Sequence, residues 1–154
     1  MTFLYLLINI ASLSIPFAYS FEKKMNFKKN WNAVFLGIFI VAIPFLIWDV
    51  WFTKIGVWGF NPDYHLSINI FGLPLEEILF FICIPYASLF IHYSLYYFFP
   101  KLKLSLTLVK VITLILIFSA LIIAFFNINK WYTVINFTVF ALLLIYSYFK
   151  KIEY

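Results

Sequence analysis

Hydrophobic positions in this 154-residue chain are gathered into long blocks, and most polar and charged positions lie between them. Within the blocks there is no strict alternation of apolar and polar residues. The blocks are Met1–Phe21, Trp31–Trp48, Ile78–Pro100, Leu104–Ile128 and Trp131–Phe149. A helix that crosses a membrane needs about 20 mostly apolar residues. The pattern therefore predicts five transmembrane helices.

Strands are a poor explanation of these blocks. Open strands would leave backbone groups unpaired in lipid, and the strands of membrane barrels alternate between apolar and polar residues. The chain is 66% hydrophobic and only 11% charged, whereas soluble domains carry about 25% charged residues. Ala18 and Ser20 resemble a signal cleavage site, but the first block lacks a basic start and is long, so we interpret it as a retained helix. We expect an all-α integral membrane helical bundle.

Lysine alone supplies the positive charge of the chain, because there is no arginine and the net charge is +5. Basic proteins often bind nucleic acid, but here the lysine positions fit a membrane topology, since cytoplasmic loops are enriched in positive charge. If the loop Phe21–Asn30 is inside, nine lysines lie inside and two, Lys54 and Lys130, lie outside. We therefore predict a multi-pass cell-membrane protein with an outer N-terminus, a cytoplasmic C-terminus and no nucleic-acid partner.

Half of the six acidic residues lie beside two neighbouring blocks. Asp49 closes the second block, and Glu76 and Glu77 stand at the start of the third. The intervening loop, Val50–Leu73, is too apolar for an ordinary solvated connection, so we expect it to lie in the interface or to fold back over the bundle. Charged residues at membrane depth are candidates for function. The predicted topology places all three acids at the outer boundary.

The glutamate pair also has a purely structural interpretation. Glutamates in the first turn of a helix complement its macrodipole. Consecutive residues on a helix point in different directions, so Glu76 and Glu77 need not face the same site. The third acid, Asp49, favours function over structure, but the sequence leaves open which acid donates a proton.

Four segments, in this order, resemble the integral-membrane lycopene cyclase domain of fused, tandem and split two-subunit carotenoid cyclases. They are Pro44-Phe-Leu-Ile-Trp-Asp49, Phe52-Thr-Lys-Ile-Gly-Val-Trp-Gly-Phe-Asn-Pro62, Leu73-Pro-Leu-Glu-Glu77 with Phe80-Phe81, and Ile84-Pro-Tyr86. The resemblance implies acid-catalysed cyclisation of lycopene ends to ionone-type rings, without net redox change. It also implies a three-helix cyclase-like unit over residues 1–99, followed at 100–154 by two helices that look like the start of an incomplete second unit.

Members of that family usually present two such units, each with its own acidic motif. This chain has one acidic motif, so the resemblance implies a second cyclase subunit or a homo-oligomer as partner. It also predicts that the chain alone is inactive or weak. The substrate class that it implies is a lipid-soluble polyene.

Cyclisation of an alkene needs a proton donor, a proton acceptor and the exclusion of water. Carboxyl groups at the edge of hydrocarbon resist ionisation, and neighbouring carboxylates add to that resistance. One of Glu76, Glu77 and Asp49 can therefore hold a proton while another stays ionised, which makes these three the catalytic candidates. Aromatic faces stabilise cations. The expected substrate-binding residues are Trp48, Trp51, Phe52, Trp58, Phe60, Asn61, Phe80 and Phe81.

No cofactor is evident, because the sequence contains no glycine-rich dinucleotide fingerprint. No metal site is predicted, because His65 has no second ligand nearby in sequence and His92 lies 15 residues after Glu77. Two other functions remain open: a small proton-coupled transport or channel subunit, and a non-catalytic partner subunit. A proton relay would require polar residues through the membrane. The apolar helix interiors favour a lipid-soluble substrate instead.

Overall fold

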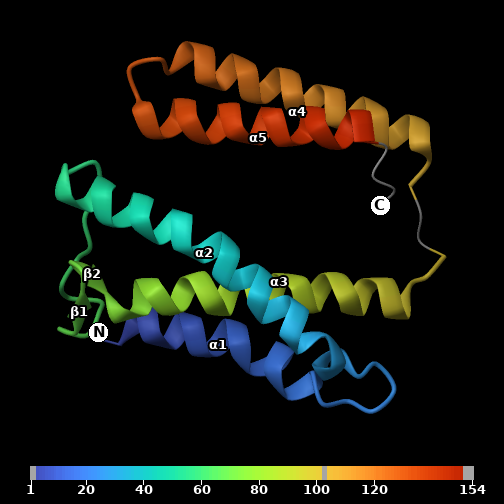
Figure 1. Ribbon diagram of the computed structural model, residues 1–154, viewed down its shortest axis with the longest axis horizontal. Coiled ribbons are helices and arrows are strands. Elements are labelled where there is room, and N and C mark those ends of the chain that lie inside the picture. The colour runs from blue at the N-terminus through green and yellow to red at the C-terminus, as the bar shows by residue number, and fades with distance from the viewer. Residues whose placement is uncertain (1–2, 102–103, 151–154) are drawn as a thin grey trace. The chain divides into compact units, whose positions relative to one another are not determined.

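The computed structural model describes residues 3–101 and 104–150, which form five α-helices, one short 3-10 helix and one two-stranded hairpin (Figure 1). The elements are α1 (Leu4–Tyr19), η1 (Phe27–Asn30), α2 (Trp31–Lys54), β1 (Asn69–Ile70), β2 (Leu73–Pro74), α3 (Leu75–Phe98), α4 (Leu106–Phe126) and α5 (Trp131–Lys150). The all-helical prediction is confirmed. Among the described residues, the four helices α2 to α5 are long and apolar enough to cross a membrane, and α1 is a shorter apolar helix of 16 residues.

The chain divides into two compact units, residues 1–100 and residues 101–154. In the first unit, α3 is the central helix and packs against both α1 and α2. The second unit is a hairpin of two helices, α4 and α5, which pack against each other (Figure 1). Ser105 begins α4 as an N-cap, and its hydroxyl accepts a hydrogen bond from the Leu108 N–H at 3.2 Å. The relation of the second unit to a second cyclase unit stays a prediction.

Two helix ends differ from the sequence prediction. The second block ends before Asp49, whereas α2 continues through the apolar residues that follow and ends at Lys54. The helix can include Asp49 because its side chain is buried and hydrogen-bonded rather than left in lipid. The third block begins at Ile78, whereas α3 begins three residues earlier, at Leu75, with Pro74 as its N-cap. Glu76 and Glu77 do lie in that first turn, as predicted.

A tight hairpin leads directly into α3. Strands β1 and β2 pair antiparallel and are joined by Phe71 and Gly72, whose φ angles are +54° and +88°. Positive φ at both central residues is the feature of the type I′ turn, which suits the twist of a two-residue hairpin. The Leu75 N–H then donates to the Ile68 carbonyl at 3.0 Å. The hairpin therefore determines where the first turn of α3 begins.

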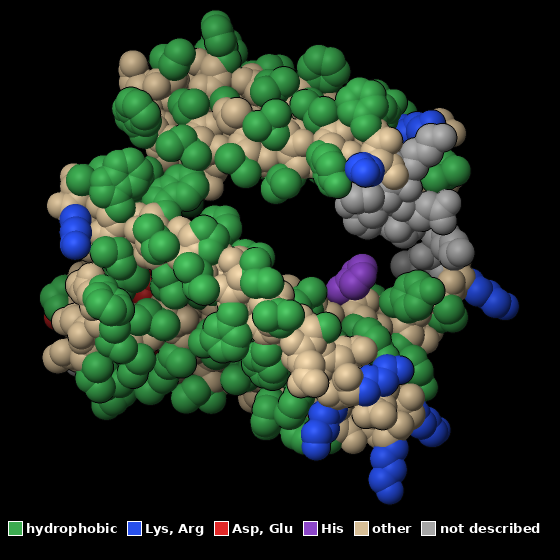
Figure 2. All heavy atoms as spheres, in the orientation of Figure 1, with side chains coloured by type: hydrophobic (Ala, Val, Ile, Leu, Met, Phe, Trp, Pro, Cys, Tyr) green, Lys and Arg blue, Asp and Glu red, His purple; other side chains and the backbone are tan. Residues whose placement is uncertain are grey.

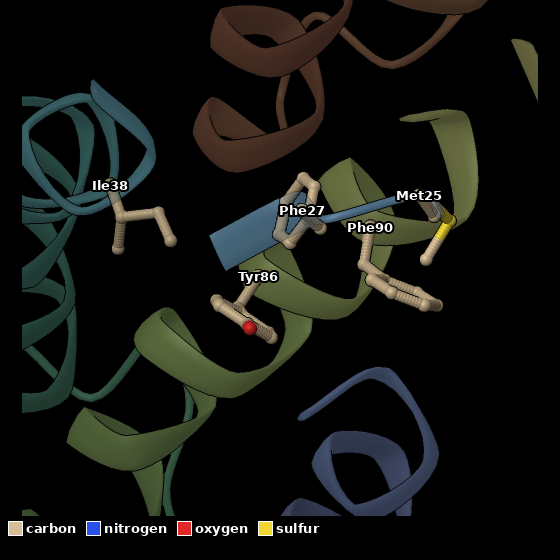
Figure 3. Packing of buried hydrophobic residues seen from close by; sticks show 5 residues of the cluster. All are labelled: Met25, Phe27, Ile38, Tyr86 and Phe90. Atoms are coloured by element: carbon tan, nitrogen blue, oxygen red, sulfur yellow. The ribbon is translucent and has the colours of Figure 1, made fainter. Parts of the chain in front are cut away.

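Buried apolar side chains hold together the end of the first unit that lies away from this hairpin. The cluster consists of Met25, Phe27, Ile38, Tyr86 and Phe90, from the loop before η1, from η1 itself, and from α2 and α3 (Figure 3). Its rings pack edge to face, with centroids 5.8 Å apart for Phe27 and Tyr86 and 5.4 Å apart for Phe27 and Phe90.

A chain of hydrogen bonds runs through the same end of the first unit. The Trp31 indole N–H donates to the Tyr86 hydroxyl at 3.0 Å. The Tyr86 hydroxyl lies 2.6 Å from the Ser20 hydroxyl, which itself donates to the Pro16 carbonyl at 2.6 Å. Tyr86 is therefore the donor to Ser20. These four residues join the C-terminal end of α1 to α2 and α3.

Large hydrophobic side chains are exposed along the helices of both units (Figure 2). A soluble protein rarely exposes apolar surface on this scale, whereas helices in lipid do so routinely. Lysines are exposed around the loop between α1 and α2. The ammonium group of Lys28 stands 5.3 Å and 5.8 Å from the ring centroids of Phe21 and Trp31, which are cation–π distances.

Candidate active site

Glu76 is enclosed by α1 and by the loop that precedes α3. It is 1% exposed, and its Oε1 accepts a hydrogen bond from the Leu66 N–H at 2.6 Å. Its backbone carbonyl accepts a second bond, from Nδ2 of the buried Asn9 on α1, at 2.8 Å. Side chain and backbone of Glu76 are thus held by two different segments.

Glu77 faces a different helix, although it is the next residue. Its side chain is partly exposed, and the nearby charge with which it interacts is that of Asp49 on α2. Asp49 is 5% exposed, and its Oδ1 accepts a hydrogen bond from the Trp58 indole N–H at 2.7 Å. Glu77 of α3 therefore lies within electrostatic range of Asp49 on α2, whereas the side chain of Glu76 bonds to the loop at Leu66.

The acids do not converge on one point. Over residues 3–101 and 104–150, no group of three or more His, Cys, Asp or Glu side chains is arranged to hold a metal ion. What α2 and α3 bring together is a pair of carboxyl groups, one of them reachable from outside the unit. Such a pair suits proton exchange, in which one group gives a proton and the other takes one.

Aromatic rings surround Asp49 on its own helix and on the loop that follows. The ring centroid of the buried Phe52 lies 5.3 Å from that of Trp48, 5.1 Å from that of Trp51 and 5.0 Å from that of Trp58. Because Trp58 also donates to Asp49, the loop after α2 closes back over this helix. Four of the eight expected substrate-binding residues therefore form one aromatic group beside an acid.

The other expected substrate-binding residues are more scattered. Phe81 of α3 lies 6.4 Å, centroid to centroid, from Phe45 of α2, and Phe80 is 41% exposed beside it. Phe60 is partly buried. Asn61 is exposed, and its Oδ1 accepts a hydrogen bond from the Asp63 N–H at 3.0 Å within a local turn. In the structure, Asn61 is a turn residue.

Two residues that contact Glu76, Asn9 and Leu66, were not singled out from the sequence. His65, next to Leu66, was considered only as a metal ligand. His65 is 8% exposed, and its Nδ1 lies 2.6 Å from the Leu66 carbonyl. Asn9 could have been found from the sequence, because it is an amide side chain in the middle of an apolar block. Polar groups in such a position usually bond to a neighbouring helix. Leu66 acts through its backbone, which leaves no trace in the sequence.

Four buried side-chain oxygens at this end of the first unit have no hydrogen-bond partner among the described residues. They are Oδ2 of Asp49, Oε2 of Glu76, Oδ1 of Asn9 and Oγ1 of Thr53. Buried polar atoms without partners are uncommon in proteins and call for an explanation.

Comparison with known proteins assigns the sequence to a family. The lycopene cyclase family matches residues 2–95 and 129–153, which is more than half of the chain. The bifunctional lycopene cyclase/phytoene synthase of Podospora anserina is 26% identical over 81 residues, which are 53% of this chain and 13% of that protein. The chain thus spans a small part of that curated relative. No solved structure matches it. The chain belongs to the lycopene cyclase family.

Proposed function

We propose that this chain closes ionone-type rings at the ends of lycopene, as one unit of a two-unit cyclase in the cell membrane. The observation that carries the proposal is the placement of Glu77 on α3 within electrostatic range of the buried Asp49 on α2, beside a group of aromatic rings and within an apolar surface. Membership of the lycopene cyclase family supports the substrate class.

The proposed reaction begins and ends with a proton transfer. A carboxylic acid adds a proton to the terminal trisubstituted alkene, which leaves a tertiary carbocation. A nearby double bond attacks the cation and closes a six-membered ring, and the positive charge moves into the ring. Loss of one proton to a carboxylate forms the ring double bond. One proton enters and one leaves, so the product is an isomer of the substrate and no oxidant or reductant takes part.

We assign the proton donor role to Glu77 and the complementary acceptor role to Asp49. Two neighbouring carboxyl groups share one proton more readily than they carry two charges. A substrate in the lipid can reach Glu77, which is partly exposed, whereas Glu76 is 1% exposed. Glu76 is then a positioning residue, because its Oε1 holds the loop through Leu66.

The aromatic rings have two tasks in this proposal. Trp58 orients Asp49 by donating to its Oδ1, which leaves Oδ2 for the proton. Trp48 and Phe52 present π-faces near the carboxyl pair, and such faces stabilise a carbocation while offering it no nucleophile. The apolar surroundings also exclude water, which would otherwise capture the cation.

A second unit is part of the proposal because the chain carries one acidic motif, at residues 72–81. We expect the chain alone to form few or no rings. Addition of a partner subunit that carries a second acidic motif is expected to restore cyclisation.

Expression in a lycopene-accumulating host, followed by analysis of the pigments, tests the proposal. Three strains are compared: the chain alone, the chain with a partner subunit that carries the second acidic motif, and that partner alone. Cyclic carotenoids are expected only in the strain with both subunits. Full cyclisation by the chain alone would refute the need for a second unit, and its failure in every combination would refute the cyclase function.

A further inference from the structure

We infer that Asn9 of α1 is a positioning residue for cyclisation, because it fixes the peptide group that joins Glu76 to Glu77. The inference rests on the proposed function. It adds a residue from a helix that carries none of the acids. The geometry of one hydrogen bond between α1 and α3 is its basis.

Asn9 donates two hydrogen bonds of different kinds. Its Nδ2 lies 3.1 Å from the Tyr5 carbonyl, one turn earlier in α1, and 2.8 Å from the Glu76 carbonyl on α3. The first is an ordinary bond of an amide side chain to its own helix. The second links two helices. The carbonyl of residue 76 belongs to the peptide unit between residues 76 and 77, so this bond ties that unit, in the first turn of α3, to α1.

The first turn of α3 is held from two sides. Asn9 holds the backbone of Glu76, and the Leu66 N–H holds its side chain at 2.6 Å. With the backbone and the side chain of Glu76 both held, the rotation of the first turn of α3 relative to α1 and the loop is fixed. That rotation places Glu77 on the side of α3 within electrostatic range of Asp49 on α2.

Stability alone is a poor reason for an asparagine at this position. Asn9 is 4% exposed, and its Oδ1 has no hydrogen-bond partner among the described residues. An unpaired acceptor costs free energy, which an apolar side chain of similar volume would avoid. The bond to Glu76 is the contact that an apolar residue would lose.

Two variants and one matched control test the inference in the complete assembly. Asn9→Leu keeps the approximate volume and removes the donor, whereas Asn9→Gln keeps an amide donor on a longer side chain. Asn136→Leu is the control, because Asn136 of α5 makes the same own-helix bond, to the Tyr132 carbonyl at 3.1 Å. The rate of lycopene conversion per folded protein is measured against pH and against substrate concentration.

Asn9→Leu is expected to lower the maximal rate on the order of 10²-fold, the effect of misplacing a reacting group by about 1 Å. The substrate concentration at half-maximal rate should change little, and the pH profile should be displaced because the Glu77–Asp49 pair is altered. Asn9→Gln should recover part of the rate. Asn136→Leu should retain the wild-type rate and pH profile.

Hydrogen exchange over residues 64–78 gives a second readout that needs no activity. Faster exchange in Asn9→Leu, with unchanged exchange in Asn136→Leu, shows that Asn9 anchors the first turn of α3, and this result stands even if the wild-type assembly forms no rings and the proposed function is refuted. The inference is overturned if Asn9→Leu keeps the wild-type exchange. It is also overturned if Asn9→Leu keeps the wild-type rate and pH profile, or if Asn136→Leu loses as much activity.

Discussion

At the scale of single residues, the acidic motif contains two glutamates with different surroundings. Glu76 is buried and accepts a hydrogen bond from a loop N–H, whereas Glu77 is partly exposed and interacts with Asp49. The difference follows from the helix itself, on which neighbouring side chains point about 100° apart. Adjacent positions in the sequence therefore do not imply a shared role.

The two glutamates are expected to respond differently to the same substitution. Glu77→Gln should lower lycopene conversion by about 10²- to 10⁴-fold, since glutamine keeps the shape of the side chain but cannot supply the proton. Glu76→Gln should keep most of the conversion, because its amide oxygen can still accept from Leu66. Asp49→Asn should be impaired. Lycopene conversion and protein level are measured together in the active assembly. If Glu76→Gln loses activity and Glu77→Gln keeps it, the proton donor is Glu76 rather than Glu77.

Glu22, in the loop between α1 and α2, predicts a pH effect on stability. Its Oε2 accepts a hydrogen bond from the Met25 N–H at 2.7 Å, and this bond, with a smaller one from the Lys24 backbone, lowers the pKa of Glu22. A lowered pKa stabilises the fold above the ordinary pKa of glutamate, about 4.3. That contribution is lost as the pH falls through the folded-state pKa.

The expected result is a drop in the thermal stability of the purified protein on acidification, which is smaller in Glu22→Gln. Glutamine can still accept from Met25 but does not titrate. Thermal unfolding in detergent, followed at several pH values for both proteins, measures the difference. Identical acid sensitivity of the two proteins would contradict the prediction.

At the scale of the helices, Tyr86 joins the three elements of the first unit. It is 1% exposed, accepts from Trp31 and donates to Ser20. Tyr86→Phe removes the hydroxyl and leaves the partly buried Trp31 indole N–H without its acceptor, which typically costs about 1–3 kcal/mol. We expect the free energy of unfolding to fall by that amount.

Unfolding of the purified protein by denaturant measures the effect of Tyr86→Phe. Tyr146→Phe is a suitable control, because Tyr146 is 58% exposed and substitutions at exposed sites usually change stability by less than about 0.5 kcal/mol. Equal stability of the two variants would show that the hydrogen bonds of Tyr86 contribute nothing to the packing of α1, α2 and α3.

At the scale of the whole molecule, the lysines predict the orientation in the membrane. We expect the loop Phe21–Asn30 and the C-terminus to be cytoplasmic, because positive charge is retained on that side. In a Cys83→Ser background, a cysteine at Lys54 should react with an impermeant thiol reagent added outside intact cells. A cysteine at Lys28 should be protected, and its labelling would reverse the orientation.

The sequence by itself determined the class, the number of helices and the acidic motif. Apolar blocks of bilayer length can form only helices in lipid, because each backbone group must be paired within its own segment. That requirement is local, so it is visible in the pattern of residues. Pro74 and the start of the third block likewise mark where α3 begins, and so they place Glu76 and Glu77 in its first turn.

Only the tertiary structure decided which residues meet. The extension of α2 past Asp49, the pairing of Asp49 with Glu77 and the bond from Asn9 to Glu76 all depend on how the helices rotate about their axes and how far apart they lie. Every face of these helices is apolar, so hydropathy cannot indicate which face a helix turns to its neighbour. The contacts are set by packing and by hydrogen bonds between different segments. One of these bonds comes from the backbone N–H of Leu66. Any residue except proline would supply that N–H, so the sequence does not mark it.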